Sequence, residues 1–501
     1  MDTAHVDVTP RRRRRRRARK LLPWAGGAVV LVWALSACIS APSVPPAAAL
    51  AVPAASRAAA SAARGSPFVK VVARELSVTG PHGRMSQPER EALLRRLSEQ
   101  GSATLLQRQL AAMSVFGDVD LVAGNRSELL VDGPATFEAM FKVIDKARDR
   151  ILVESYIVED AAIAGRLADA LMRKRAEGVK VALLYDAVGS IGTDEAFFDK
   201  LRGAGVAVCA YNPFGASRQR RTQPLTQRDH RKILVVDGGV GFVGGINLSS
   251  VYSSGSFSAH RREARDAGAD DVGWRDTNVQ LRGPVAARLD QLVRDSWHDQ
   301  GCDGGLPAAA APPEQPAAGS DVIRVVDTRP DDDYSRMYAQ LMTAFDTAQR
   351  SIYLTMAYFA PGDDMVDALC DAARRGVDVQ LVLPSRSDFM PVIHAGRARY
   401  AQLLDAGVKI HEFQTAILHA KTAVVDGVWS TVGSSNMDYR SFAANNEINV
   451  VVLGEDFGNG MQQLFRRDVA ASRTITAQEW RERDLGQRVV QGLARLFERW
   501  W

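Results

Sequence analysis

Two segments of the chain repeat one another, and this repeat constrains the fold more than any other feature. The segment HRKILVVDGGVGFVGGIN runs from His230 to Asn247, and HAKTAVVDGVWSTVGSSN runs from His419 to Asn436. Both have His, one residue, Lys, four residues, Asp, six residues, two small residues, one residue and Asn, without a gap. The duplication predicts two similar halves.

Each copy is predicted to form a β-hairpin. An apolar, strand-like run follows each Lys, and side chains two apart on a strand lie on the same face. The Asp-Gly that ends each run is typical of a tight hairpin loop. A two-residue loop would place Gly245 opposite His230 and Ser434 opposite His419. The expected groups at the end of each hairpin are an imidazole, an ammonium and an amide: His230, Lys232 and Asn247 in the first copy, and His419, Lys421 and Asn436 in the second.

This pattern resembles the signature of the phospholipase D superfamily, and the resemblance covers roughly residues 130 to 470. ILVESYIVED, RLADALMRKRAEGVKVALLYD and LRGAGVAVCAYNPF precede the first motif, and SIYLTMAYFAPGDD, MVDALCDAARRGVDVQLVLP and LLDAGVKIHEF precede the second. Each half is expected to fold as strand, helix, buried strand, helix, short strand and hairpin, which indicates α/β domains with a largely parallel sheet. The resemblance implies two tandem phospholipase D-like α/β domains that form a pseudo-dimer with one active site between them.

The chain is expected to divide into seven regions. We expect a signal peptide with a lipobox at 1–37, an Ala/Pro/Ser-rich tether at 38–66, a helical region at 67–128, a first phospholipase D-like domain at 129–301, a linker at 302–321, a second such domain at 322–472 and a C-terminal amphipathic helix at 473–501.

The residue types in the motifs suit phosphodiester chemistry. A neutral imidazole can attack phosphorus while an imidazolium protonates the leaving group. Lys232, Lys421, Asn247 and Asn436 would stabilise the phosphoryl oxygens. The resemblance implies that His230 forms a phosphohistidine and that His419 is the acid.

An imidazole also needs a partner that holds its second nitrogen. The superfamily places an acidic residue after each motif, and Asp276 and Glu447 stand at suitable places, although either could be an ordinary strand-end residue. Asp237 and Asp426 belong to the predicted turns and are expected to be structural. The other six histidines are scattered and the cysteines show no paired spacing, so we expect no metal and no cofactor.

The first 38 residues indicate a bacterial cell-envelope protein. A basic run precedes LLPWAGGAVVLVWALSAC, which is typical of a secretory signal. LSAC resembles a lipobox, which implies a lipid anchor at Cys38 facing the periplasm, and Ile39 favours the outer membrane. Cys209, Cys302 and Cys370 remain, and their odd number and wide spacing predict no disulfide framework.

The positive net charge of the chain comes from its N-terminus. Residues 1–37 contain nine basic and two acidic residues, so the remainder is close to −2 in a chain of net charge +5. We therefore expect no nucleic-acid partner, which weakens the hypothesis of a nuclease.

The amino-acid sequence around the motifs resembles that of bacterial cardiolipin synthases. YNPF, RDHRKILVVDG, FVGGIN and WRDT carry this resemblance. It implies transfer of a phosphatidyl group between phospholipids, with phosphatidylglycerol, or in some branches phosphatidylethanolamine, as substrate and a membrane surface as partner. A hydrolase releasing phosphatidic acid and an inactive binding module remain alternatives. The donor lipid, the acceptor and the oligomeric state stay open.

The C-terminal segment AQEWRERDLGQRVVQGLARLFERWW has apolar residues at helical spacing with arginines opposite. Such a stripe is typical of a helix that docks on the body of the protein or of one that lies at a membrane interface. The sequence leaves both interpretations open.

Overall fold

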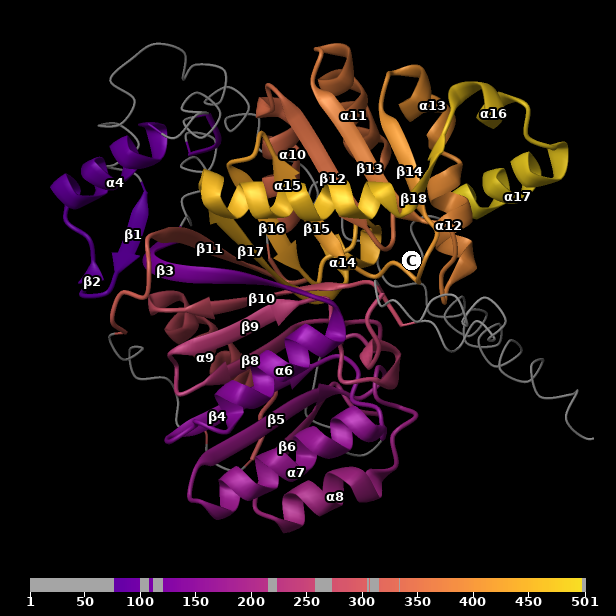
Figure 1. Ribbon diagram of the computed structural model, residues 1–501. Coiled ribbons are helices and arrows are strands. Elements are labelled where there is room, and N and C mark those ends of the chain that lie inside the picture. Colours follow the sequence, from indigo (N-terminus) through magenta and orange to yellow (C-terminus); the bar gives the residue numbers. More distant parts are fainter. Residues whose placement is uncertain are drawn as a thin grey trace, which may run out of the picture. The chain divides into compact units, whose positions relative to one another are not determined.

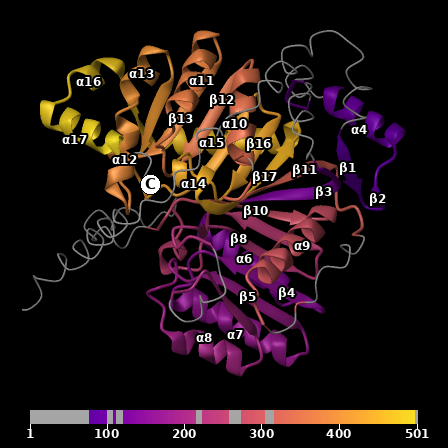
Figure 2. The same ribbon diagram turned by 180° about the vertical axis from the view of Figure 1, so that it is seen from behind.

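The computed structural model describes residues 76–99, 108–110, 120–214, 223–256, 273–303, 306, 315–332 and 334–497 (Figures 1 and 2). The predicted signal peptide, the lipobox at Cys38 and the tether lie outside the described residues. No helix among those residues combines the length and apolar composition that a membrane crossing requires.

The strands of the first half form one mixed sheet. In spatial order they are β3 (Asp120–Val131), β10 (Thr277–Arg282), β9 (Val240–Gly244), β8 (Lys232–Val236), β4 (Arg150–Ser155), β5 (Lys180–Asp186) and β6 (Ala207–Tyr211). The β4–β5 and β5–β6 pairs are parallel and the others are antiparallel.

The second half repeats this order. Its strands are β11 (Asp321–Thr328), β17 (Asn445–Leu453), β16 (Trp429–Gly433), β15 (Lys421–Val425), β12 (Ser351–Met356), β13 (Asp378–Pro384), β14 (Lys409–Phe413) and the additional β18 (Ser472–Ile475). β3 pairs with β11, so the two halves share one continuous sheet. The expectation of two α/β halves is confirmed.

Helices cover both faces of each half of the sheet (Figure 1). In the first half, one face packs against α6 (Asp132–Ile144), α7 (Ala162–Ala176) and α8 (Glu195–Gly203), and the other against α9 (Pro284–Asp299). In the second half, one face packs against α10 (Arg336–Thr347), α11 (Asp363–Arg374) and α13 (Tyr400–Asp405), and the other against α15 (Glu455–Ala470). The remaining helices are α4 (Gln87–Glu99), η3 (Ser250–Tyr252), α12 (Met390–Arg397), α14 (Tyr439–Ala443), α16 (Ala477–Arg481) and α17 (Leu485–Leu496).

The continuous apolar runs of the motifs follow from this layering. In β8, Leu234 and Val236 pack on one side of the sheet while Ile233 and Val235 pack on the other. A strand buried on both faces does not alternate with polar residues.

The expectation of a largely parallel sheet is wrong, because the hairpins and the strands that follow them add antiparallel ladders to each half. The two-residue hairpin loop is also wrong. Val236 pairs with Val240 and Val425 pairs with Trp429, so each loop has three residues and the register shifts by one. Asp237 adopts φ 52°, which short polar side chains tolerate and which allows this longer loop.

The region expected to be helical at 67–128 contains α4, but also β1 (Ser77–Gly80), β2 (Gly83–Arg84) and the start of β3. β1 pairs in parallel with β3 and thereby extends the sheet. The region at 473–501 likewise contains α16 besides α17.

The absence of a disulfide is a further expectation that the structure contradicts. Cys209 of β6 and Cys302, just after α9, form a disulfide with Cα atoms 5.8 Å apart. The two residues are 93 positions apart, and only the packing of α9 near the β6 edge brings them together. Cys370 is free and buried.

Candidate active site

Each histidine of the duplicated motif is held by the backbone of the other half. His230 lies just before β8, and its backbone N–H donates to Asn446 O of β17 at 2.9 Å. β7 (Arg228–Asp229) pairs in parallel with the start of the same strand. His419 lies before β15, and its N–H donates to Arg275 O, just ahead of β10, at 2.8 Å. The histidines therefore lie where the two halves meet.

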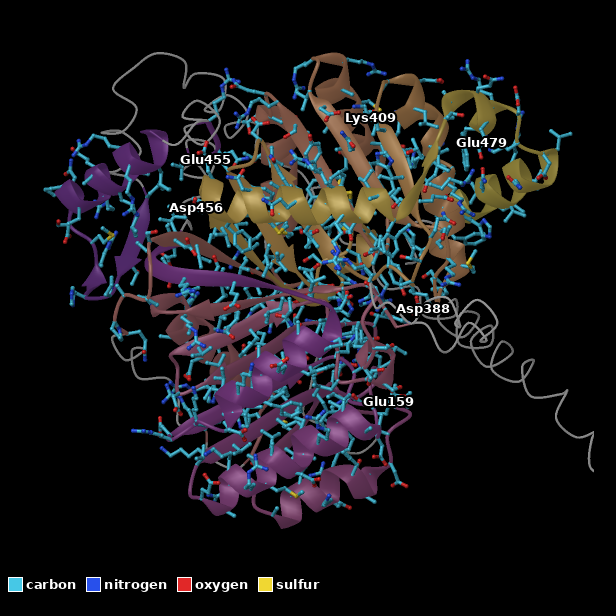
Figure 3. All side chains as sticks on the ribbon, in the orientation of Figure 1. Glu159, Asp388, Lys409, Glu455, Asp456 and Glu479 are labelled. Atoms are coloured by element: carbon cyan, nitrogen blue, oxygen red, sulfur yellow. A yellow bond between two sulfur atoms is a disulfide. The ribbon has the colours of Figure 1, made fainter. Side chains whose placement is uncertain are left out.

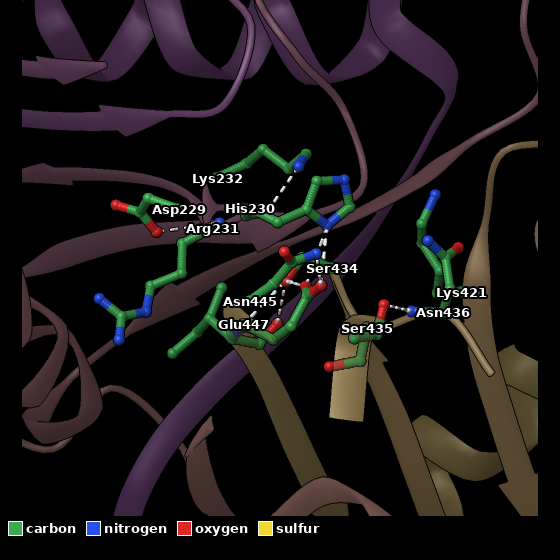
Figure 4. A network of polar contacts seen from close by, with 12 residues as sticks. Asp229, His230, Arg231, Lys232, Lys421, Ser434, Ser435, Asn436, Asn445 and Glu447 are labelled. Carbon is green, nitrogen blue, oxygen red and sulfur yellow. Dashed lines mark hydrogen bonds and ion pairs between the residues drawn. The ribbon is translucent and has the colours of Figure 1, made fainter. Parts of the chain in front are cut away.

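The side-chain partner of His230 also comes from the other half. His230 Nδ1 lies 3.0 Å from each carboxylate oxygen of Glu447 in β17. Figure 4 shows Glu447 of the second half pointing at the imidazole of His230. An ionised carboxylate at Nδ1 favours the tautomer with its proton there and leaves Nε2 as the free acceptor.

The second histidine is likewise paired with a carboxylate of the other half. His419 Nδ1 lies 2.7 Å from Asp276 Oδ2, and Asp276 belongs to the first half. The carboxylates thus cross between the halves: the carboxylate at each imidazole comes from the other half, although Lys421 Nζ of its own half also lies 3.0 Å from His419 Nδ1.

Small residues in the hairpins let these carboxylates approach. A Cβ on Gly245 would lie 2.3 Å from Asp276 Oδ1, a distance that real Cβ atoms do not adopt. Ser434 occupies the equivalent position in the second half, and its hydroxyl donates to Glu447 Oε2. The small residue of each motif therefore contacts the carboxylate that serves the other half.

The two lysines are buried beside the histidines. Lys232 Nζ donates to His230 O at 2.5 Å, and Lys421 Nζ donates to His419 O at the same distance. Burial lowers the pKa of Lys232 to about 7 and that of Lys421 to about 8. The Lys421 ammonium also lowers the pKa of Lys232, so an anion between them would be bound by two positive charges.

Burial also favours neutral imidazoles. It lowers the pKa of His230 to about 4, although Glu447 acts in the opposite direction. The pKa of His419 is lowered as well, by burial and by Lys421. Burial alone would raise the pKa of Glu447, but His230 and Lys232 outweigh it and bring the pKa to about 2. The free site therefore holds an ionised Glu447 against a neutral His230.

The two asparagines are buried at the ends of the hairpins. Asn247 Oδ1 accepts from the backbone N–H of Ile157 at 3.2 Å. The backbone N–H of Asn436 donates to Ser441 Oγ at 3.1 Å. Both lie beyond the last paired residues of β9 and β16, at the same end of the hairpins as the lysines.

Asp237 and Asp426 lie at the opposite ends of the hairpins. Asp237 accepts hydrogen bonds from the backbone N–H groups of residues 148, 149 and 150, where β4 begins. Asp426 does the same for residues 349, 350 and 351 at the start of β12. Neither carboxylate faces the histidines.

Tyr252 is a site residue that the sequence did not reveal. Its hydroxyl lies 2.9 Å from His419 Nδ1, and Asn247 donates to it at 3.5 Å. Ser441 stands the same number of positions after His419 as Tyr252 does after His230, so this contact breaks the symmetry of the halves. Tyr252 stands in the polar run SSVYSS, and nothing in that run indicates a contact with the other half.

Aromatic rings surround both imidazoles. Tyr156 lies edge-on to His230 with ring centroids 4.9 Å apart, and Lys232 Nζ lies 5.0 Å from the centre of the same ring. The ring centroids of Trp274 and His419 are 5.1 Å apart. Such walls exclude water and strengthen the electrostatic interactions of the site.

Comparison with known proteins places this chain among phospholipase D-like proteins. Residues 140–256 and 341–469 match the family described as "Cardiolipin synthase, PLD-like domain". Cardiolipin synthase A of Pseudomonas putida is 35% identical over 410 residues, covering 81% of this chain and 80% of that protein. Cardiolipin synthase of Geobacillus thermodenitrificans is 34% identical over 384 residues, covering 76% of this chain and 73% of that protein. The chain belongs to the cardiolipin synthase family.

A solved structure shares the fold. The crystal structure of phosphatidylserine synthase from Haemophilus influenzae has a TM-score of 0.53 and 13% identity, and the match covers 74% of this chain and 93% of that one. At this identity the likeness concerns the fold alone.

Proposed function

We propose that this protein is a phosphatidyltransferase of the cardiolipin synthase type, which moves a phosphatidyl group between phospholipids through a phosphohistidine. The observation that carries the proposal is the reciprocal exchange of carboxylates, His230 with Glu447 and His419 with Asp276. This exchange orients two imidazoles at one junction, so that one can attack phosphorus while the other protonates the leaving group.

In the first step, His230 Nε2 attacks the phosphorus of the donor lipid and forms a P–N bond. The P–O bond to the leaving alcohol breaks, and His419 donates a proton to the departing oxygen. His230 suits this role because burial keeps it neutral and Glu447 holds its Nδ1 proton. The phosphodiester anion would favour the protonated form of His419 on binding.

In the second step, the hydroxyl of an acceptor lipid attacks the same phosphorus. Its proton passes to His419, a new P–O bond forms and the P–N bond breaks, which restores both histidines. Lys232 and Lys421 would neutralise the phosphoryl oxygens throughout, and Asn247 and Asn436 would donate hydrogen bonds to them.

The proposed substrate is a phospholipid, with phosphatidylglycerol or phosphatidylethanolamine as donor. The relatives bear the name cardiolipin synthase, which supports a lipid acceptor rather than water. Mass spectrometry of lipids after incubation with phosphatidylglycerol vesicles, with and without phosphatidylethanolamine, tests the proposal. Cardiolipin is the expected product, and phosphatidic acid alone would show that water is the acceptor.

The proposed location is the periplasmic side of the bacterial envelope, with a lipid anchor at Cys38. The disulfide between Cys209 and Cys302 supports it, because such bonds persist in oxidising compartments. Metabolic labelling with a palmitate analogue, compared between the natural chain and Cys38→Ser, tests the anchor. Equal labelling of the two chains would contradict it.

A further inference from the structure

Helix α17 packs with its apolar face outward. Leu485, Val489, Leu493 and Leu496 form a stripe on this helix, and they are 75%, 60%, 55% and 74% exposed. The opposite face carries Gln491, which is buried, and Ala494, which packs near α12. Helices on soluble proteins normally turn the apolar stripe inward, so this orientation requires another partner.

The surface beneath α17 explains why the stripe is not buried there. A polar cavity of about 690 Å³ lies between α17, α16, α12 and the edge of the sheet, with lining residues that include His394, Arg397, Glu412, Arg473, Gln487 and Gln491. Arg397 forms an ion pair with Glu412 at 2.8 Å in this cavity. Leucine side chains turned into it would meet charged groups instead of an apolar core.

The position of α17 connects it to the active site. Arg495 of α17 lies 3.2 Å from Asp363 at the start of α11, which follows β12. Tyr358, just after β12, donates to Asp388 at 2.8 Å, and its ring centroid lies 6.4 Å from that of His419. Asp388 lies where the two halves meet, and α12 begins two residues later (Figure 3).

Other exposed apolar side chains lie at the same end of the strands as the candidate active site. The carboxyl ends of β4 and β12 lead to the site, because Ser155 pairs with Lys232 and Met356 pairs with Lys421. Four exposed large apolar residues of the described part of the chain lie in segments that follow strands parallel to these or that just precede β7: Ile191, Phe214, Leu225 and Met390. The apolar surface therefore gathers around the site and on α17.

We propose that α17 and the four exposed apolar residues near the site form a membrane-docking face. This face places the active site on a lipid bilayer, independently of any anchor at Cys38. The occupant is a bilayer containing anionic phospholipid. α17 carries Arg488, Arg495, which is paired with Asp363, and no carboxylate, so the helix itself is positively charged, which suits an in-plane helix on such a surface. The proposal rests on the proposed function and deepens it, since the long-chain lipids that a phosphatidyltransferase joins reside in a bilayer.

A probe on α17 tests docking without any need for turnover. An environment-sensitive NBD fluorophore is attached through Leu493→Cys in a full chain that carries Cys38→Ser, and vesicles of phosphatidylglycerol and phosphatidylcholine are added. A blue shift and quenching by brominated lipids are expected at this position, and neither at Lys200→Cys on α8. Equal responses at both positions, or no response at Leu493→Cys, would overturn the proposal. A blue shift that grows with protein concentration without vesicles would instead identify a second copy of the chain as the occupant.

Kinetics provide the second test. Val489→Glu with Leu493→Glu is expected to lower turnover on phosphatidylglycerol vesicles at least about tenfold, because charged side chains oppose insertion of the helix. Turnover of monomeric dihexanoyl phosphatidylglycerol should not change. Lys142→Gln with Lys200→Gln produces the same change in net charge far from α17 and should leave both rates intact.

These outcomes separate the two proposals. If the unaltered chain turns over neither substrate while the probe still reports docking, the proposed function fails and the docking face stands. If the Glu variant matches the unaltered chain on vesicles, the docking face fails and the proposed function stands.

Discussion

His230 Nδ1 lies 3.0 Å from both oxygens of Glu447, a residue that lies on the far side of the junction between the two halves. The first half therefore does not supply the carboxylate that holds His230, its proposed nucleophile. The two halves must be joined, here through β3 and β11, before either imidazole is held in place.

The first prediction concerns this contact. Glu447→Gln should lower kcat about 10- to 100-fold, since a carboxylate that orients an imidazole is typically worth that much. The change should also move the acidic limb of the pH profile to lower pH, because Glu447 raises the pKa of His230. Steady-state rates across pH measure both effects.

A matched control is Glu412→Gln, which removes a buried carboxylate of the second half that pairs with Arg397. It should leave the pH profile in place. An unmoved profile for Glu447→Gln would mean that this residue supports the fold and does not position the imidazole.

The second prediction concerns the asymmetry between the histidines. Tyr252→Phe removes a hydroxyl 2.9 Å from His419 Nδ1 and keeps the ring. Loss of one such hydrogen bond should lower kcat roughly fivefold, which corresponds to about 1 kcal/mol. The loss should be larger for a lipid leaving group than for 4-nitrophenol, whose departure needs no acid. Tyr353→Phe, which removes a hydroxyl bonded to Asp378, is the control; equal losses with both leaving groups would contradict a role through His419.

The third prediction is the pH dependence of the unaltered protein. Burial lowers the pKa of Lys232 to about 7 and of Lys421 to about 8, so their positive charge is lost as pH rises through that range. The pKa of His230 near 4 keeps the proposed nucleophile neutral well below pH 7. kcat/KM on a soluble short-chain lipid should therefore fall between pH 7 and pH 9. A rate that keeps rising to pH 9 would contradict a role for the two ammonium groups.

The fourth prediction separates the motif aspartates from the chemistry. Asp426→Asn should lower the free energy of unfolding by ~1–3 kcal/mol, because one of three backbone N–H groups at the start of β12 loses its acceptor. kcat per folded molecule should stay unchanged. Denaturant unfolding and active-site titration measure the two quantities, with Asp371→Asn on the exposed face of α11 as control. Loss of kcat without loss of stability would place Asp426 in the chemistry.

Much of the fold could be predicted from the sequence because the motif is duplicated and its periodicity is strong. The repeat of His230 and His419 predicts two halves, and the apolar runs after Lys232 and Lys421 predict hairpins. The loop length could not be predicted, because it depends on Asp237 accepting hydrogen bonds from the start of β4, far away in sequence.

Contacts between the halves could not be predicted either, because they also join residues that are far apart in sequence. Asp276 and Glu447 could be recognised as candidates, but their exchange between halves depends on the pairing of β3 with β11. The disulfide of Cys209 and Cys302 and the contact of Tyr252 with His419 likewise join segments whose distance in space has no sequence signal.

Locating the covalent intermediate tests the proposed mechanism most directly. The His419→Ala chain is mixed with a phosphatidyl ester of 4-nitrophenol, quenched in alkali to preserve phosphohistidine, digested and mapped by mass spectrometry. We expect a phosphatidyl adduct on His230 that accumulates in His419→Ala, because the second step lacks its base, and that is absent from His230→Ala. An adduct on another residue, or full turnover by His230→Ala, would contradict it.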